Sequence, residues 1–250
     1  MNDTTLTDYC NKFLGFGHWN APIWFIGIEE AGGWKVEEVE NRLRVWDELG
    51  RQPLEDAPRF YPASGNTFWY GANAKIQRTW SQLIRVLLLA QGRADTDDAI
   101  LSYQLSQLGA KNGETCLMEL LPLPSPNTRD WNYNQWSTLA WLQSRNSYIN
   151  EIHVGRVNEL RRQINNRKPR VVIFYGLTLP DRSLLPSWSS IGVGCFQQAI
   201  QDEEILLWRE NANTIFFVMR HSVAENDEYF RKIGRYLFAN HANRFQKLWN

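Results

Sequence analysis

The sequence contains few cysteines, and their spacing excludes several kinds of site. The three cysteines, Cys10, Cys116 and Cys195, lie far apart and form no C-x-x-C pair. Structural zinc sites, iron–sulfur clusters and disulfide frameworks all need cysteines in recognisable pairs or clusters. We therefore expect inert thiols, no metal site and no redox cofactor.

The sequence also lacks an apolar run long enough to cross a bilayer. Its longest apolar runs, residues 83–90 and 171–177, are interrupted by Arg85 or fall far short of the roughly 20 residues that a membrane-spanning helix needs. The polar, acidic start at residues 1–5 contains neither an apolar signal segment nor an arginine-rich transit peptide. These features predict a soluble, cytoplasmic protein with no membrane partner.

Net charge is absent as well, because 27 Lys and Arg residues balance 27 Asp and Glu residues. A neutral chain offers no global electrostatic argument for a nucleic-acid partner, so any basic surface has to be local. The most basic stretch, residues 161–170, has five cations and no acid. A solvated helix face is the simpler interpretation of this stretch.

Apolar and aromatic residues, in contrast, are plentiful. They make up 43% of a chain of 250 residues, which is enough to bury the core of one large domain spanning residues 1–250. The 12 tryptophans exceed what a core of this size requires, so we expect some of them to line a groove. We expect this domain to be a monomer.

Short apolar runs followed by loops indicate the strands of a sheet. Four of them lie at residues 23–28, 116–121, 171–175 and 215–219. Helical spacing of apolar residues predicts helices at residues 36–49, 72–91, 150–166 and 227–248. Residues 196–200 and 204–210 alternate loosely and are typical of a small hairpin insertion, whereas residues 53–62 read as an irregular loop.

Alternation of strands and helices implies right-handed crossovers between parallel strands. We therefore predict an α/β fold with three layers, α/β/α, around a central parallel sheet of four strands. The first strand is expected to lie between the second and the third. Side chains that follow the carboxyl ends of these strands then meet in one crevice.

Two adjacent carboxylates follow the first strand. They are Glu29 and Glu30 in the glycine-bounded segment 27–33, which has the sequence G-I-E-E-A-G-G. Glycine lets backbone approach a ligand closely, and a strand-end carboxylate is able to take a proton from water. A plain acidic loop is the alternative interpretation. The segment is neither a G-x-G-x-x-G dinucleotide motif nor a phosphate-binding loop.

Three further segments lie beside other strand ends or helix starts. Residues 65–71, G-N-T-F-W-Y-G, precede the second predicted helix, and residues 121–129, L-P-L-P-S-P-N-T-R, follow the second strand. Residues 220–222, R-H-S, follow the fourth strand. Taken in order with the carboxylate segment, they resemble the site loops of the uracil-DNA glycosylase superfamily.

This resemblance implies a metal-independent DNA glycosylase that flips a deaminated or modified base and hydrolyses its N-glycosidic bond. Its partner would be single- or double-stranded DNA, or a nucleobase ligand. Implied catalytic residues are Glu29 or Glu30, which position or activate water, and His221, which stabilises the departing base. Implied substrate contacts are Gly27, Phe68 as the stacking ring, Met118 or Glu119 at the base edge, Asn127 and Ser222. Implied DNA contacts are Arg129, Arg220 and Val223.

The sequence departs from the family pattern at several of these positions. The first motif carries Glu-Glu-Ala where the family shows G-E-A-P-G, G-x-N-P-G or G-Q-D-P-Y. The strand at residues 116–121 has no asparagine, and Ser222 replaces a proline of the last loop. An asparagine amide donates and accepts, whereas an ionised Glu119 only accepts, which suits an amino-bearing base such as cytosine or adenine. Glu119 facing the other side of its strand is the alternative.

Two other functions remain open at this stage. The chain fits a catalytically inactive module that binds a nucleobase or nucleic acid on the same fold. It also fits an unrelated small-molecule hydrolase, because a fold does not determine a function.

Overall fold

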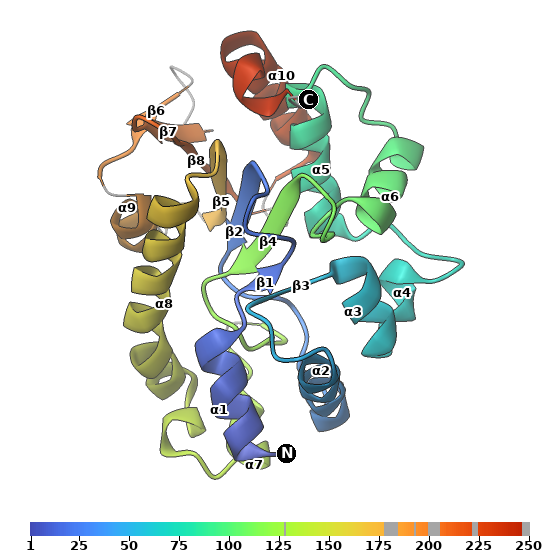
Figure 1. The fold of residues 1–250 in the computed structure, drawn as a ribbon, viewed down its shortest axis with the longest axis vertical. Coiled ribbons are helices and arrows are strands. Elements are labelled where there is room, and N and C mark those ends of the chain that lie inside the picture. The colour runs from blue at the N-terminus through green and yellow to red at the C-terminus, as the bar shows by residue number, and fades with distance from the viewer. Residues whose placement is uncertain (128, 178–184, 193, 200–205, 222–224, 247–250) are drawn as a thin grey trace.

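The computed structural model describes residues 1–127, 129–177, 185–192, 194–199, 206–221 and 225–246. In this part of the chain, one mixed sheet is covered by helices on both faces (Figure 1). The eight strands of the sheet follow the order β3-β1-β4-β2-β5-β8-β7-β6. Their bounds are β1 Gly15–Phe16, β2 Ile23–Gly27, β3 Leu54–Glu55, β4 Thr115–Glu119, β5 Val171–Leu177, β6 Gln197–Gln198, β7 Leu206–Glu210 and β8 Ile215–Arg220.

The helices occupy the intervals between these strands. They are α1 Asp3–Lys12, α2 Val36–Glu48, α3 Ala57–Ala63, α4 Thr67–Tyr70, α5 Arg78–Ala90, α6 Asp97–Ser106, α7 Tyr133–Trp136, α8 Arg145–Arg167, α9 Leu185–Gly192 and α10 Asp227–Phe245, with a 3-10 turn at Ala140–Leu142. Among the described residues, none of these helices has the length and apolar content that a membrane crossing requires.

The four strands predicted from the sequence are present and lie side by side. β2 pairs in parallel with β4 on one side and with β5 on the other, and β5 pairs in parallel with β8. The first predicted strand therefore lies between the second and the third. All five residues of β2 are buried, because helices cover both faces of the sheet there.

The expectation of a four-stranded sheet is wrong, because both edges are extended. At one edge, β1 joins β4 antiparallel and β3 joins β1 in parallel. At the other edge, β7 pairs antiparallel with both β8 and β6, so the expected hairpin continues the sheet. β1, β3 and β6 have two residues each, too few to give a hydrophobic period in the sequence.

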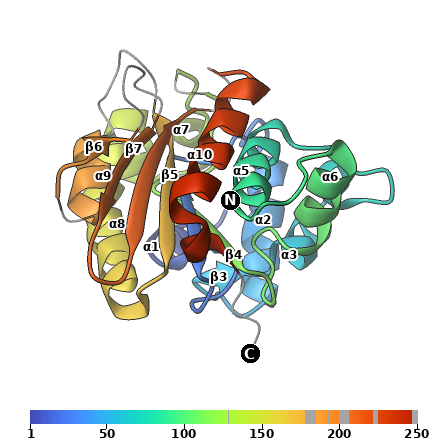
Figure 2. The same ribbon diagram turned by 90° about the horizontal axis from the view of Figure 1, so that it is seen from above.

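Each face of the sheet contributes to its own core. Ile23 and Phe25 point to one face, which packs against α1, α2, α3, α5, α6 and α10. Trp24 and Ile26 point to the other face, which packs against α8 and α9. This alternation along β2 follows from the pleat of the strand. The view in Figure 2 shows α8 and α9 on one side of the sheet and α5 and α10 on the other.

Two predicted segments begin or fold differently in the structure. The helix expected at residues 72–91 begins only at Arg78, because the Gln77 side chain caps it by accepting a hydrogen bond from the Trp80 N–H at 2.6 Å. The loop expected at residues 53–62 contains β3 and most of α3. Pro58 suits the first turn of α3, where no N–H donor is needed.

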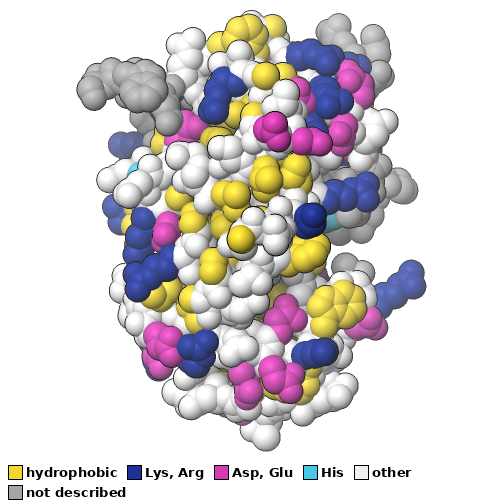
Figure 3. All heavy atoms as spheres, turned by 90° about the vertical axis from the view of Figure 1, so that its right-hand side faces the viewer, with side chains coloured by type: hydrophobic (Ala, Val, Ile, Leu, Met, Phe, Trp, Pro, Cys, Tyr) yellow, Lys and Arg dark blue, Asp and Glu magenta, His cyan; other side chains and the backbone are white. Residues whose placement is uncertain are grey.

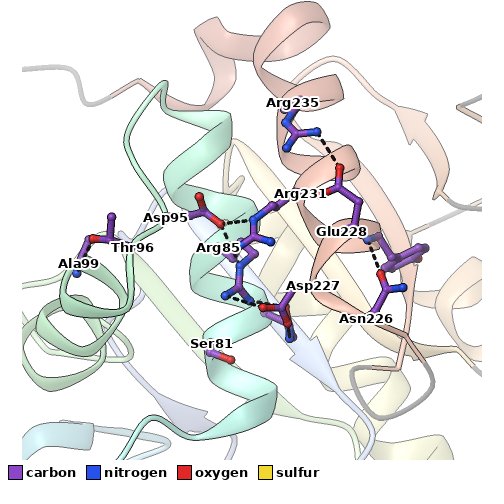
Figure 4. Close-up of polar contacts among 12 residues, drawn as sticks. Ser81, Arg85, Asp95, Thr96, Ala99, Asn226, Asp227, Glu228, Arg231 and Arg235 are labelled. Carbon is purple, nitrogen blue, oxygen red and sulfur yellow. Dashed lines mark hydrogen bonds and ion pairs between the residues drawn. The ribbon is translucent and has the colours of Figure 1, made fainter.

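Ion pairs tie α5 to α10 and to the loop between α5 and α6 (Figure 4). Arg85 of α5 is 4% exposed, and it contacts Asp95 at 2.9 Å and Asp227 at 3.1 Å. Arg231 of α10 also contacts Asp95, at 2.8 Å. The loop carboxylate thus bridges two of the helices that cover one face of the sheet.

Candidate active site

A cleft of about 600 Å³ opens where β2, β4, β5 and β8 end. Residues that follow or end these strands line it, together with residues of α2, the segment before α5 and the start of α5. The residues predicted from the sequence that line the cleft are Glu29, Glu30, Phe68, Glu119 and His221. Parallel strands bring these distant segments together, as expected at the carboxyl edge of such a sheet.

Glu30 is the more accessible carboxylate of the adjacent pair, with its side chain 22% exposed against 11% for Glu29. Its Oε2 accepts a hydrogen bond from Arg42 Nη2, and its Oε1 accepts one from the Tyr61 hydroxyl at 2.8 Å. Arg42 is itself fixed, because its Nε donates to the Tyr9 hydroxyl at 2.6 Å. The carboxylate of Glu30 is therefore held in one orientation at a place that water can reach.

Glu29 is held by a different arginine. Its Oε1 accepts a hydrogen bond from Arg145 Nη2, while Arg145 Nη1 donates to Ser125 Oγ at 3.1 Å. The Glu29 Oε2 is buried and has no hydrogen-bond partner among the described residues. Burial raises the pKa of this carboxyl above its ordinary value, against the opposing effect of Arg145. Glu29 thus links the carboxylate segment to the Pro-rich loop.

Glu119 ends β4 and lies beside Tyr175, which donates a hydrogen bond from its hydroxyl to Glu119 Oε1 at 2.6 Å. Burial, with smaller contributions from Glu30 and Glu29, raises the pKa of Glu119 to about 8. Its side chain is therefore largely a neutral carboxylic acid at neutral pH. A neutral carboxyl donates one hydrogen bond and accepts others.

Gly27 lies beneath this carboxyl and is needed there. A Cβ atom at position 27 would come within 2.2 Å of Glu119 Oε2 and 2.5 Å of the Tyr175 hydroxyl. Gly27 does not itself line the cleft; its contribution is to leave room for Glu119. Met118 contradicts the expectation of a base contact, because it is fully buried in the core on the opposite face of the sheet, with Trp24.

His221 directly follows β8 and lines the cleft. Burial lowers the pKa of its imidazole below the ordinary value, and the positive charge of Arg78 lowers it further. A neutral imidazole is the favoured form at neutral pH. A neutral imidazole keeps one N–H group, which can donate a hydrogen bond to a developing negative charge.

Phe68 stands on α4 with 59% of its surface exposed. The Phe68 ring contacts the Trp69 ring edge to face, with the two ring centroids 4.5 Å apart. Behind it, Tyr61 stacks on Tyr70 at 5.2 Å, and both rings contact Trp80. The aromatic residues of this segment therefore support an exposed ring at the cleft.

Of the remaining predicted contacts, Asn127, Arg129 and Arg220 are not among the residues that line the cleft. Asn127 is not at the cleft, because its side chain stabilises a turn: Oδ1 accepts from the Arg129 and Asp130 N–H groups at 2.7 and 2.9 Å. Arg129 is exposed and does not line the cleft. Arg220 forms an ion pair with Glu225 and lies over the Tyr229 ring, so its charge is neutralised within the protein. Ser222 and Val223 lie outside the described residues.

Sequence analysis missed the groups that orient the carboxyls. Arg42 and Arg145 sit on helices whose charged residues look solvent-exposed in the sequence, and Arg145 is 116 positions from its partner Glu29. The one available signal was the position of Tyr175, which ends a predicted strand just before Gly176. Within the part of the chain that the structure describes, His, Cys, Asp and Glu side chains form no cluster that would hold a metal ion.

No family model matches the chain, and no curated protein matches it either. The function of the cleft has to be inferred from its own residues and from the resemblance described above.

Proposed function

We propose that the protein is a DNA glycosylase that takes a flipped base into this cleft and hydrolyses its N-glycosidic bond. The observation that carries the proposal is that Glu30, Phe68, Glu119 and His221 line one cleft although they come from four separate segments. The order β4-β2-β5-β8 of the parallel strands supports it, because it suits a uracil-DNA glycosylase-like domain with a parallel core of four strands.

Base binding in this proposal depends on Phe68 and Glu119. Stacking on the Phe68 ring contributes about 1–3 kcal/mol, whatever the identity of the base. The neutral Glu119 carboxyl then pairs with a base edge that has a donor beside an acceptor. The N–H and carbonyl of uracil or hypoxanthine form such an edge, so the acceptor-only interpretation of Glu119 does not apply at neutral pH.

Hydrolysis in this proposal uses Glu30 and His221. Glu30, oriented by Arg42 and Tyr61, accepts a proton from the attacking water, whose oxygen bonds to the sugar carbon. The electron pair of the broken carbon–nitrogen bond moves onto the base. The neutral imidazole of His221 donates a hydrogen bond to the resulting anion.

A binding module without chemistry is the second candidate function. It is favoured by the two hydrogen bonds that already engage the Glu30 oxygens, because they leave fewer lone pairs to orient an attacking water. The same cleft would then recognise a nucleobase and leave its bond intact.

One experiment separates these functions. Purified protein is incubated with single- and double-stranded oligonucleotides that carry uracil, hypoxanthine, xanthine or methylated cytosine, and alkali then cleaves any abasic product. We expect base release from at least one substrate. Glu30→Gln should slow single-turnover release by about 10²–10⁴-fold, the range for loss of a general base.

Glu48→Gln is the matched control, because Glu48 also pairs with an arginine, Arg44, but at the exposed surface of α2. It should leave the rate unchanged. Binding of the oligonucleotides without release of any base would reject the glycosylase and support the binding module.

A further inference from the structure

Two segments that both contribute residues to the lining of the cleft differ in charge. Residues 29–48 contain seven acidic residues and three cations. Residues 57–94 contain five cations and no acidic residue at all, within a chain whose overall charge is zero. One part of the cleft border is therefore acidic and another part basic, although the composition as a whole gives no such indication.

Four of the five cations of the basic segment are exposed and form no ion pair with a described residue, and two of these, Lys75 and Arg78, are the first to follow Phe68 in the sequence. Neither Lys75 nor Arg78 forms an ion pair with any residue that the structure describes, and both are exposed. The other cations beside the cleft are engaged: Arg42 and Arg145 pair with Glu30 and Glu29. An exposed cation without a carboxylate partner is available to bind an anion from solution.

These two cations lie in the segment that runs from the exposed ring to the start of α5, just outside the residues that line the cleft. The Lys75 N–H donates to the Phe68 carbonyl at 2.9 Å, which ties Lys75 to the helix that carries the exposed ring. Arg78 begins α5 and lies close enough to His221 to lower its pKa. An aromatic face and two free cations therefore occur together along residues 68–78.

Figure 3 shows the side of the molecule that carries α3, α4 and α6 in Figure 1. Hydrophobic side chains reach the surface in its middle, with Lys, Arg, Asp and Glu side chains around them. Exposed rings with cations beside them are the pattern by which proteins bind unpaired nucleic acid, since bases stack on the rings and phosphates contact the cations.

We propose that residues 68–78 form a binding surface for an unpaired nucleic-acid strand, with one base stacked on Phe68 and phosphates neutralised by Lys75 and Arg78. The acidic segment 29–48 repels phosphates and so keeps the backbone of the strand on the basic side of the cleft. A base in a duplex has to be unpaired and unstacked before it can lie on Phe68, at a cost in free energy, whereas a base in a single strand avoids most of this cost. The inference rests on the proposed function and identifies the strand that the cleft receives.

The test measures binding of a fluorescent single strand without any lesion, about 12 nucleotides long, by anisotropy over a series of salt concentrations. Each phosphate contact on a single strand contributes about −0.7 to the slope of log K against log salt. Lys75→Gln with Arg78→Gln should therefore flatten the slope by about 1.4. Lys111→Gln with Arg161→Gln removes the same charge from exposed positions elsewhere and should leave the slope unchanged.

A second pair of variants tests the ring. Phe68→Ala should weaken binding about 5- to 150-fold, the equivalent of one lost stacking contact. Phe238→Ala removes an exposed phenylalanine from α10 and should have no effect. Circular dichroism shows that each variant is folded before its binding is compared.

Several results would overturn the inference. An unchanged salt slope in the Lys75 and Arg78 variant, equal binding of a duplex of the same sequence, or wild-type affinity in Phe68→Ala would each reject this surface. Because the strand carries no lesion, these results do not depend on catalysis. If the predicted binding is found and no base is ever released, the proposed function fails and this inference stands.

Discussion

Glu119 occupies a position where its protonated form is favoured. Tyr175, the carboxyls of Glu29 and Glu30, and Arg42 all act on its ionisation. Loss of hydration and two negative neighbours oppose ionisation, and the hydrogen bond from Tyr175 and the charge of Arg42 only partly offset them. A carboxyl of this kind acts as donor and acceptor in the way an amide does, so in the proposed function Glu119 takes the part of the asparagine found in the glycosylases that the sequence resembles.

The first prediction concerns the pH dependence of stability. A carboxyl whose pKa rises on folding holds its proton in the folded state, so the free energy of unfolding falls as pH increases from about 4.5 to about 8. Glu119→Gln cannot ionise and should make this part of the curve flatter, with stability higher near pH 8 relative to the wild type. Urea unfolding at a series of pH values measures the effect.

Glu37→Gln serves as the control, because Glu37 is exposed on α2 and should leave the curve unchanged. Parallel pH curves for wild type and Glu119→Gln would show that Glu119 ionises normally in the folded protein. The role of Glu119 as a neutral donor and acceptor would then be rejected.

At the scale of elements, the attachment of α5 and α10 depends on one loop carboxylate. Asp95 lies between Arg85 and Arg231, and Arg85 is almost completely buried (Figure 4). A buried guanidinium that loses a partner retains its desolvation cost, which makes removal of the partner expensive. Since Thr79 and Trp80 in the first turn of α5 line the cleft, the same contacts help to position one of its borders.

The second prediction follows from this network. Asp95→Asn should lower the free energy of unfolding by about 1–3 kcal/mol, since Asp227 and Gln82 still contact Arg85. Glu228→Gln removes a carboxylate from an exposed pair with Arg235 on the same helix and should cost about 0–1 kcal/mol. Chemical denaturation gives both values. Equal small losses would mean that the network does not hold the two helices.

At the scale of the whole molecule, strong local patterns were predictable and long-range contacts were not. The four core strands are continuous apolar runs, and this identified them from the sequence. The same continuity concealed which of Met118 and Glu119 faces the cleft, because a strand covered on both faces shows no alternation of polar and apolar residues. The two-residue strands and the pairing of Arg145 with Glu29 leave no periodic signal either.

The last prediction concerns the thermal stability of the protein with a ligand bound in the cleft, where four separate segments meet. A ligand that contacts Phe68, Glu119 and His221 together binds only the folded chain, so it should stabilise the whole molecule. At 100 times its dissociation constant the gain is about 2.7 kcal/mol, which corresponds to a rise of roughly 5–10 °C in melting temperature for a chain of this size. Glu30→Gln, mixed with a uracil-bearing single strand, is the form to test, because the base is not consumed.

The rise should disappear when Phe68→Ala is added to Glu30→Gln, since the stacked base is then lost. It should persist when Phe238→Ala is added instead, because Phe238 lies on α10 away from the cleft residues. A rise that survives the Phe68 change would place the strand elsewhere on the molecule. Stabilisation by a ligand requires contacts that exist only in the folded state. Such a result would therefore show that the nucleic acid binds outside the cleft, even if it binds tightly.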